Sequence, residues 1–219
     1  MVDPTSPATA DNTNGNGTLL SKIGSAIVIL ILAISIAGIG SAGFSVSYYH
    51  HEVTLLHLIT FTSWFGCSVW VTFIAGIVMF KNLPRHVFGR LQAKLFPAYF
   101  IFSALVVAIS MMCAAALGYE VKSLGIILVT ILMNVLYFEP ETTRIMILRH
   151  AVERRLKTGH EIGQLKPSDP VKANDPELKA LSKKFGMLHG VSTTLNMVAL
   201  GFGCYWLNFL ASLMGETIH

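Results

Sequence analysis

Long apolar runs, separated by short polar segments, dominate the hydrophobic pattern of this chain. The runs cover residues 23–46, 53–80, 95–117, 123–138 and 186–213, and the fourth is short for a membrane span. A helix needs roughly 20 apolar residues to cross the hydrocarbon core. Backbone polar groups in lipid must bond within their own segment, so each run is predicted to be a helix. The pattern predicts an all-α integral membrane protein, with an antiparallel four-helix transmembrane bundle preceded by one extra N-terminal transmembrane helix.

The same pattern divides the chain into three parts. Residues 1–22 are rich in Asn, Gly, Thr and Pro, and this composition predicts a disordered polar tail. Residues 23–47 form the extra helix, and their apolar run is longer than that of a usual signal segment, which favours a retained span over a cleaved signal. Residues 53–213 form the four-helix membrane domain, which includes a cytoplasmic loop at residues 139–185.

Placing the charges on this pattern predicts the orientation. If all five runs cross the membrane, fifteen of the sixteen Lys and Arg residues lie on one side, and Lys122 is alone on the other. Lys and Arg in short flanking loops mark the cytoplasmic face. We therefore expect a cytoplasmic N-terminus and a luminal or extracellular C-terminus, in the endomembrane system or the plasma membrane. Charged residues make up 13% of the chain, against about 25% in soluble domains, so most of the chain avoids bulk water.

The first basic loop, KNLPRHVFGRLQAK at Lys81–Lys94, has the pattern of an interfacial helix. Pro84 suits the first position of a helix. Val87, Leu91 and Leu95 then share one face, which leaves basic side chains for lipid phosphates. The hypothesis is that four side chains contact lipid head groups: Arg85, His86, Arg90 and Lys94. The alternative is a connector whose charges only set the topology.

The second basic loop, residues 139–185, predicts two further helices. Glu139-Pro140 is expected to end the fourth span, and Glu141–Thr158 has helical spacing. A breaker cluster follows at Lys166–Pro170, and Asp175-Pro176-Glu177 is typical of a helix start. We expect a helical hairpin lying on the cytoplasmic mouth of the bundle, with its second helix running into the last span.

Polar residues at membrane depth are the first candidates for function, because each is costly there. They are His57, Asn134, Glu139, His189 and Asn196. His57 and His189 lie near opposite ends of their spans, roughly 25 Å apart along the membrane normal at about 1.5 Å rise per residue, so one metal ion cannot bind both. The asparagines could line a substrate path, but hydrogen bonding between helices is the favoured interpretation.

Soft ligands form a weaker set of candidates, for an ion such as Cu(I). They are Met111, Met112, Cys113 and Cys204. Methionine and cysteine are also ordinary apolar filler, and no CxxC pair is present. The sequence indicates no cofactor and no disulfide. It has no P-loop, HExxH or Ser/His/Asp order and no paired intramembrane carboxylates, so an enzyme is the poorer class of hypothesis. The sequence has no basic stretch interleaved with aromatic residues in a soluble context, so nothing indicates nucleic-acid binding.

Several ordered motifs carry a family resemblance. They are Ser63-Trp64-Phe65-Gly66-Cys67-Ser68-Val69-Trp70-Val71-Thr72-Phe73, Leu83-Pro84-Arg85-His86-x-Phe88-Gly89, Gln92-x-Lys94-Leu95-Phe96-Pro97-x-Tyr99-Phe100, Glu139-Pro140-x-Thr142-Thr143 and Phe185-x-x-x-His189-Gly190-x-Ser192, with Asn196 four residues later. Over residues 57–207 the chain resembles the transmembrane protein 205 family, whose shared domain has no assigned biochemical activity. The resemblance implies a four-helix membrane domain, an endomembrane or plasma-membrane location, and the association of animal members with resistance to platinum drugs. The extra segment at residues 23–46 departs from the family pattern.

These observations together favour a multi-pass membrane protein that aids export or trafficking of small solutes or soft metal complexes. The alternative is a non-transporting scaffold whose basic loops bind anionic lipids or partner proteins. The implied partners are the lipid bilayer, anionic lipids at the cytoplasmic face, and other membrane proteins or further copies of the chain.

Overall fold

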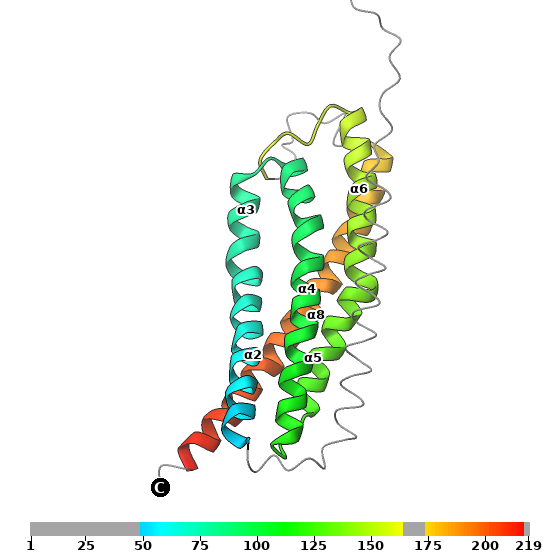
Figure 1. The fold of residues 1–219 in the computed structure, drawn as a ribbon. Helices are drawn as coiled ribbons and strands as arrows, with labels where there is room; N and C mark the ends of the chain where they lie inside the picture. The colour runs from blue at the N-terminus through cyan, green and yellow to red at the C-terminus, as the bar shows by residue number, and fades with distance from the viewer. Residues whose placement is uncertain (1–48, 164–173, 217–219) are drawn as a thin grey trace, which may run out of the picture.

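The computed structural model describes residues 49–163 and 174–216. The polar tail at residues 1–22, the extra helix at residues 23–47, the breaker cluster at Lys166–Pro170 and the C-terminal His219 lie outside the described residues. Within the described part, the fold is all-helical (Figure 1).

The described residues form four long helices, two of which contain a π-helical turn. The first helix comprises α2 (His50–Trp70), η2 (Val71–Ala75) and α3 (Gly76–Asn82), the second is α4 (Arg85–Ala116), the third comprises α5 (Lys122–Met133), η3 (Asn134–Phe138) and α6 (Glu139–Arg155), and the fourth is α8 (Pro176–Glu216). All four are long and apolar enough to cross a membrane, with mean hydropathy between 1.5 and 2.2. The structure therefore confirms the predicted set of four membrane-spanning helices.

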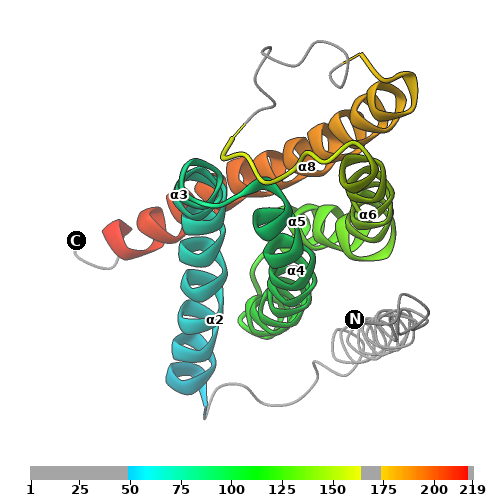
Figure 2. The ribbon, with the colours of Figure 1, turned by 90° about the horizontal axis from the view of Figure 1, so that it is seen from above.

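The helices run antiparallel, and the last one crosses the bundle diagonally. The helix α2 packs against α4, and α4 packs against α5. The helix α8 contacts α6, α5 and α2 (Figures 1 and 2). This diagonal path makes α8 the element that joins both halves of the bundle.

The third helix passes through a proline that was predicted to end it. Pro140 has no N–H to donate, and its ring crowds the carbonyl four residues earlier, which normally kinks or stops a helix. Here the π-helical turn η3 lies directly before it, and its wider backbone spacing lets the helix continue to Arg155. The helix therefore continues past Glu139-Pro140, where the sequence pattern placed the end of the fourth span.

Both basic loops are shorter than the sequence pattern indicated. The connection between α3 and α4 is only Leu83-Pro84, so Val87 and Leu91 belong to the long helix α4 and not to an in-plane interfacial helix. Likewise, much of residues 139–185 extends α5 and α8 beyond the apolar runs, because α6 continues to Arg155 and α8 begins at Pro176. No separate hairpin lies across the mouth in the described part.

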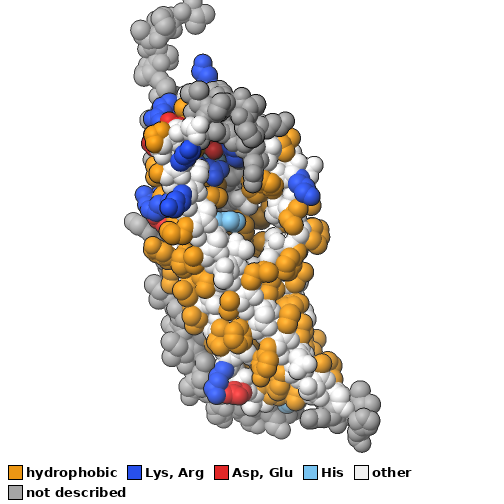
Figure 3. Space-filling model, turned by 180° about the vertical axis from the view of Figure 1, so that it is seen from behind, with side chains coloured by type: hydrophobic (Ala, Val, Ile, Leu, Met, Phe, Trp, Pro, Cys, Tyr) orange, Lys and Arg blue, Asp and Glu red, His pale blue; other side chains and the backbone are white. Residues whose placement is uncertain are grey.

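The apolar residues of the bundle fall into two groups, those buried in the core and those exposed on the outer surface. Phe61, Trp64 and Trp206 are buried between the helices. Large apolar side chains such as Ile59 and Val129 are exposed on the outside, where lipid would cover them. Lys and Arg side chains gather at one end, which we call the basic end: it is where α3 and α6 finish and α4 and α8 begin (Figure 3).

Candidate functional site

A partly open cavity of about 470 Å³ lies between the first helix, α4, α6 and α8. We call it the inner cavity. Its polar lining comes from Thr72, Gln92, Tyr99, Glu139, Thr142, Thr143, His189, Ser192, Thr193 and Asn196. Three of the candidates from the sequence, Glu139, His189 and Asn196, therefore meet around one space. They come from two helices that are about fifty residues apart in the chain.

Glu139 is the acidic group of the inner cavity. It is half-buried, and its Oε1 accepts a hydrogen bond of 2.8 Å from the Thr143 hydroxyl. It makes no ion pair with any residue that the structure describes. Arg144, on the same helix, donates two hydrogen bonds to Glu141, of 2.7 and 2.6 Å. The Glu139 carboxyl thus faces the cavity without a cation among the described residues.

His189 borders the same cavity from α8. Its ring stacks on Phe185 with centroids 5.7 Å apart and planes 5° apart. Within the described ranges, its ring nitrogens make no hydrogen bond, and its side chain is exposed. A hydrogen-bonding imidazole is therefore available to a molecule in the inner cavity.

A polar seam bounds the deep side of the inner cavity. Asn196 donates a hydrogen bond of 2.7 Å to Thr72, in the π-helical turn η2, and accepts one of 2.9 Å from Tyr99. The Tyr99 hydroxyl also lies 2.9 Å from Ser68. The seam joins three helices and satisfies the amide of Asn196, so this residue fixes the wall of the cavity.

A second cavity of about 450 Å³, the outer cavity, lies at the basic end. Its polar lining includes Arg85, Gln92, Arg149, His150, Glu153, Lys179 and Ser182. It shares lining residues with the inner cavity, among them Gln92 and Phe185. The two spaces therefore adjoin, and we call them together the recess.

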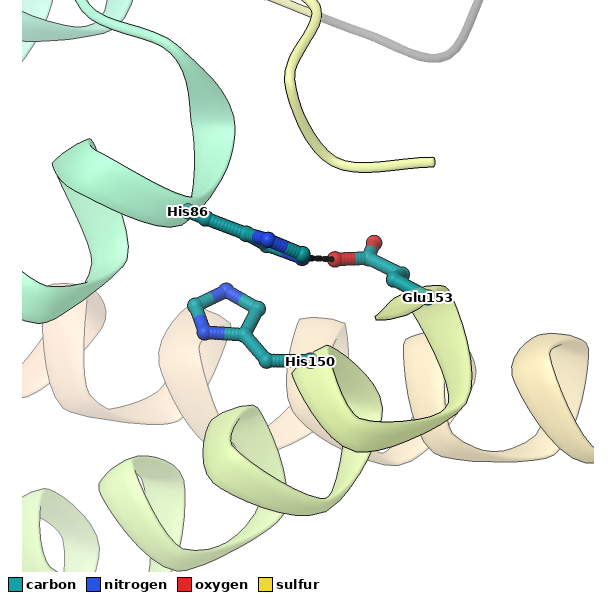
Figure 4. A group of neighbouring side chains, drawn as sticks. All are labelled: His86, His150 and Glu153. Carbon is teal, nitrogen blue, oxygen red and sulfur yellow. Dashed lines mark hydrogen bonds and ion pairs between the residues drawn. The ribbon is translucent and has the colours of Figure 1, made fainter. Parts of the chain in front are cut away.

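A cluster of buried charged side chains lines the outer cavity. Glu153 is 2% exposed. Its Oε2 lies 2.9 Å from Nε2 of His86, and its Oε1 lies 3.2 Å from Nε of Arg85 and 3.3 Å from Nε of Arg149. His150 lies beside them, with its ring centroid 4.5 Å from that of His86 (Figure 4). The cluster joins the start of α4 to the end of α6.

This geometry changes the interpretation of the four predicted head-group contacts. Arg85 and His86 turn inward, with side chains only 11% and 7% exposed, because Glu153 attracts both. Arg90 and Lys94 are exposed. Only these last two have the exposure that a surface contact with phosphates requires.

The segment after α6 holds the start of α4 in place. The first N–H groups of a helix have no partner within it. Here the N–H groups of Arg85 and His86 donate to the carbonyls of Glu161 and Gly159. Burial raises the pKa of the Glu161 carboxyl, but backbone hydrogen bonds from Glu161 and Gly159 and the charges of Arg85 and His160 outweigh it, so the pKa is below its usual value. Glu161 therefore stays ionised beside Arg85.

The structure places the other polar candidates apart from this recess. His57 is buried near the opposite end, with Nδ1 2.9 Å from the Ser110 carbonyl and Nε2 accepting a hydrogen bond of 3.1 Å from Trp206. Asn134 donates to the Ser192 carbonyl at 3.3 Å, and its buried Oδ1 has no hydrogen-bond partner among the described residues. His57 therefore has partners at both ring nitrogens.

The soft candidate ligands do not line either cavity. Met111 and Cys113 are buried in α4, Met112 is half-buried, and Cys204 is exposed on α8.

Sequence reasoning missed Arg149, His150 and Glu153 as site residues. They lie in a stretch that was interpreted as a surface helix of a loop. The spacing His150-x-x-Glu153 was the available signal, because residues three apart share a helix face. Its partner His86 became evident only when the loop after α6 brought the helix ends together.

Comparison with known proteins shows which family the chain resembles. Residues 59–151 match the family model described as "Domain of unknown function (DUF4149)". The chain is also 29% identical over 171 residues to "Transmembrane protein 205" of Danio rerio, a match that covers 72% of this chain and 90% of that protein. These similarities support a relationship to the transmembrane protein 205 family. No solved structure matches it. The region that matches the family model includes His86, Glu139 and His150 but ends before the α8 residues His189 and Asn196.

Proposed function

We propose that this transmembrane protein 205-like protein binds a small organic cation in the inner cavity and takes part in its movement across or out of the membrane. The observation that carries the proposal is the Glu139 carboxyl, which faces the cavity without a cationic partner among the described residues. An ionisable group at membrane depth is costly and is a functional candidate for that reason. A cationic solute would supply the missing charge.

The apolar lining supports the same class of solute. The rings of Phe80, Phe88, Phe96, Phe100 and Phe185 border the inner cavity. Aromatic faces attract organic cations. His189 and Gln92 add hydrogen-bonding groups that could orient a polar substituent. An amphipathic aromatic or alkyl ammonium compound matches this combination of one carboxyl, several rings and few further polar groups.

The adjacency of the two cavities supports entry from the basic end. The outer cavity lies there and adjoins the inner one. Farther from the basic end, Phe61, Trp64 and Val107 are fully buried in a packed core. By the distribution of Lys and Arg, we place the basic end in the cytoplasm. The solute would thus be accepted from the cytoplasmic side, without an enzymatic step. Soft metal complexes are less favoured, because none of the four predicted soft ligands lines the inner cavity.

The test measures binding and flux of methylphenylpyridinium with the full chain in proteoliposomes. Glu139→Gln should weaken binding at least about tenfold, which corresponds to roughly 1.4 kcal/mol. The matched control is Glu141→Gln, two residues along the same helix, whose carboxyl pairs with Arg144 and does not line either cavity. Equal affinity in both variants, with both proteins folded, would rule out Glu139 as the cation-binding group.

A scaffold that binds anionic lipids is the second candidate, and one observation favours it. Arg90 and Lys94 are exposed near the basic end, where lipid phosphates would lie if this end meets the membrane surface. Reversing both charges to Glu should reduce retention of phosphatidylserine in native mass spectrometry without altering methylphenylpyridinium binding. An unchanged lipid count would remove these two residues from the hypothesis.

A further inference from the structure

We propose that His86, His150 and Glu153 form a binding site for a borderline divalent metal ion, with Zn²⁺ as the natural occupant. One ligand atom from each residue lies within 4.8 Å of the others. All three residues are buried, at 5%, 5% and 2% exposure. The site is separate from the solute-binding groups Glu139 and His189, and the inference does not depend on the proposed function.

The three residues come from two elements that the fold fixes relative to each other. His150 and Glu153 are three residues apart on α6 and share a face, whereas His86 lies in the first turn of α4. Figure 4 shows His150 beside the hydrogen-bonded pair of His86 and Glu153. In a tetrahedral zinc site, bonds of about 2.0–2.1 Å place ligand atoms roughly 3.3 Å apart. The existing separations need only small side-chain rotations to reach this spacing.

An unpaired ring nitrogen of His150 is independent support for a ligand at this position. Its Nε2 is buried and has no hydrogen-bond partner in the part of the chain that the structure describes. Buried polar atoms nearly always have a partner, because leaving one unpaired is costly. His57, by comparison, has partners at both ring nitrogens. A metal ion between His150, His86 and Glu153 would give the Nε2 lone pair a partner.

The donor set selects the kind of ion. Two imidazoles and one carboxylate form the ligand set of zinc sites that keep an open fourth position. Mg²⁺ and Ca²⁺ prefer several oxygen ligands, and only one carboxylate is present. Zn²⁺, Co²⁺ and Ni²⁺ accept imidazole readily. The site should therefore discriminate strongly against Mg²⁺ and Ca²⁺.

The neighbouring guanidinium groups define the fourth position. Arg85 and Arg149 both contact Oε1 of Glu153, which leaves Oε2 on the side of His86. Two positive charges oppose a dication, so the site should bind most tightly when an anion completes it. Arg85, Arg149, His150 and Glu153 all line the outer cavity, which gives such an anion access. Inorganic phosphate should accordingly increase the affinity for Zn²⁺.

Two glycines keep the imidazole rings in place. A Cβ on Gly89 would overlap the His150 ring, and a Cβ on Gly159 would overlap the His86 ring. Gly159 also has φ of +99°, a conformation that other residues rarely adopt. Both rings are therefore packed directly against backbone, which limits their freedom to turn away from each other.

The test uses the full chain in detergent, loaded with Zn²⁺ or Co²⁺ and freed of excess ion, with metal content measured by plasma mass spectrometry. We expect about one Zn²⁺ per chain, loss of most of it in His150→Ala, and no loss in His51→Ala, an exposed histidine outside the cluster. The variant His150→Cys should retain metal, because thiolate is also a zinc ligand. With Co²⁺, it should add a thiolate charge-transfer band that a purely packing role of His150 would not produce.

The outcomes separate this proposal from a structural ion-pair cluster. Zinc bound to the wild type and to His150→Cys but not to His150→Ala supports the site. Folded wild-type protein that binds no Zn²⁺ or Co²⁺, with or without phosphate, overturns it. Equal metal content in wild type and His150→Ala also overturns it, because the ion would then be held elsewhere. Circular dichroism and size-exclusion profiles establish that each variant is folded before its metal content is compared.

Discussion

Asn196 of α8 donates a hydrogen bond of 2.7 Å to Thr72, which lies in the π-helical turn of the first helix. The same amide accepts a hydrogen bond from Tyr99 of α4, so one side chain joins three helices. The wall of the inner cavity consequently depends on a residue 124 positions away from the turn that it holds.

The first prediction concerns this seam. Asn196→Ala should lower the free energy of unfolding by roughly 1–2 kcal/mol, because interhelical hydrogen bonds in membranes contribute about 0.6 kcal/mol on average and up to about 1.7. Unfolding in a titration with sodium dodecyl sulfate measures the change. The control is Thr194→Ala, whose hydroxyl donates to the Gly190 carbonyl of its own helix. A loss as large in the control would contradict a special role for the seam.

The second prediction concerns His57. Trp206→Phe keeps an aromatic ring but removes the indole N–H that donates to Nε2 of His57. The buried nitrogen then lacks its partner, and the expected loss of stability is about 1–3 kcal/mol. The same detergent titration measures it. Tyr205→Phe, at an exposed neighbouring position, should have little effect. An unchanged midpoint for Trp206→Phe would show that this hydrogen bond contributes no stability.

The third prediction compares two glycines in the segment after α6. Gly159 and Gly163 both have positive φ, of 99° and 77°. An added Cβ overlaps His86 at Gly159, whereas at Gly163 it meets only Phe80 at 3.9 Å. Both Ala variants should share a backbone strain of roughly 1–3 kcal/mol, but Gly159→Ala should lower the thermal midpoint further. Equal midpoints would mean that the contact with His86 is easily relieved.

The fourth prediction concerns orientation. In a variant without native cysteines, His160→Cys lies near the basic end and Glu120→Cys lies in the turn at the opposite end, and both positions are exposed. A membrane-impermeant maleimide should label His160→Cys once digitonin has opened the plasma membrane. If the protein is in an internal membrane, Glu120→Cys should need lysis of the organelle as well; if it is in the plasma membrane, intact cells should suffice. Labelling of His160→Cys from the luminal or extracellular side would reverse the topology.

The sequence by itself determined the membrane class and the number of described spans. A run of apolar residues long enough to cross the bilayer forms a helix, because its backbone polar groups find no water in the hydrocarbon core and must bond to each other. The asymmetry of Lys and Arg likewise needs no tertiary information to predict which ends share a side. The motif order also indicated the resemblance to the transmembrane protein 205 family, which the comparisons support.

Only the tertiary structure decided which polar residues meet. Asn196 and Glu139 were evident as candidates, but their shared cavity depends on the diagonal path of α8 and on a π-helical turn that carries the chain past Pro140. Arg85 and His86 resembled surface cations until a buried carboxylate, Glu153, was placed opposite them. The physical reason is that helix periodicity is local, whereas the pairing of buried charges depends on side chains that are distant in sequence and close in space.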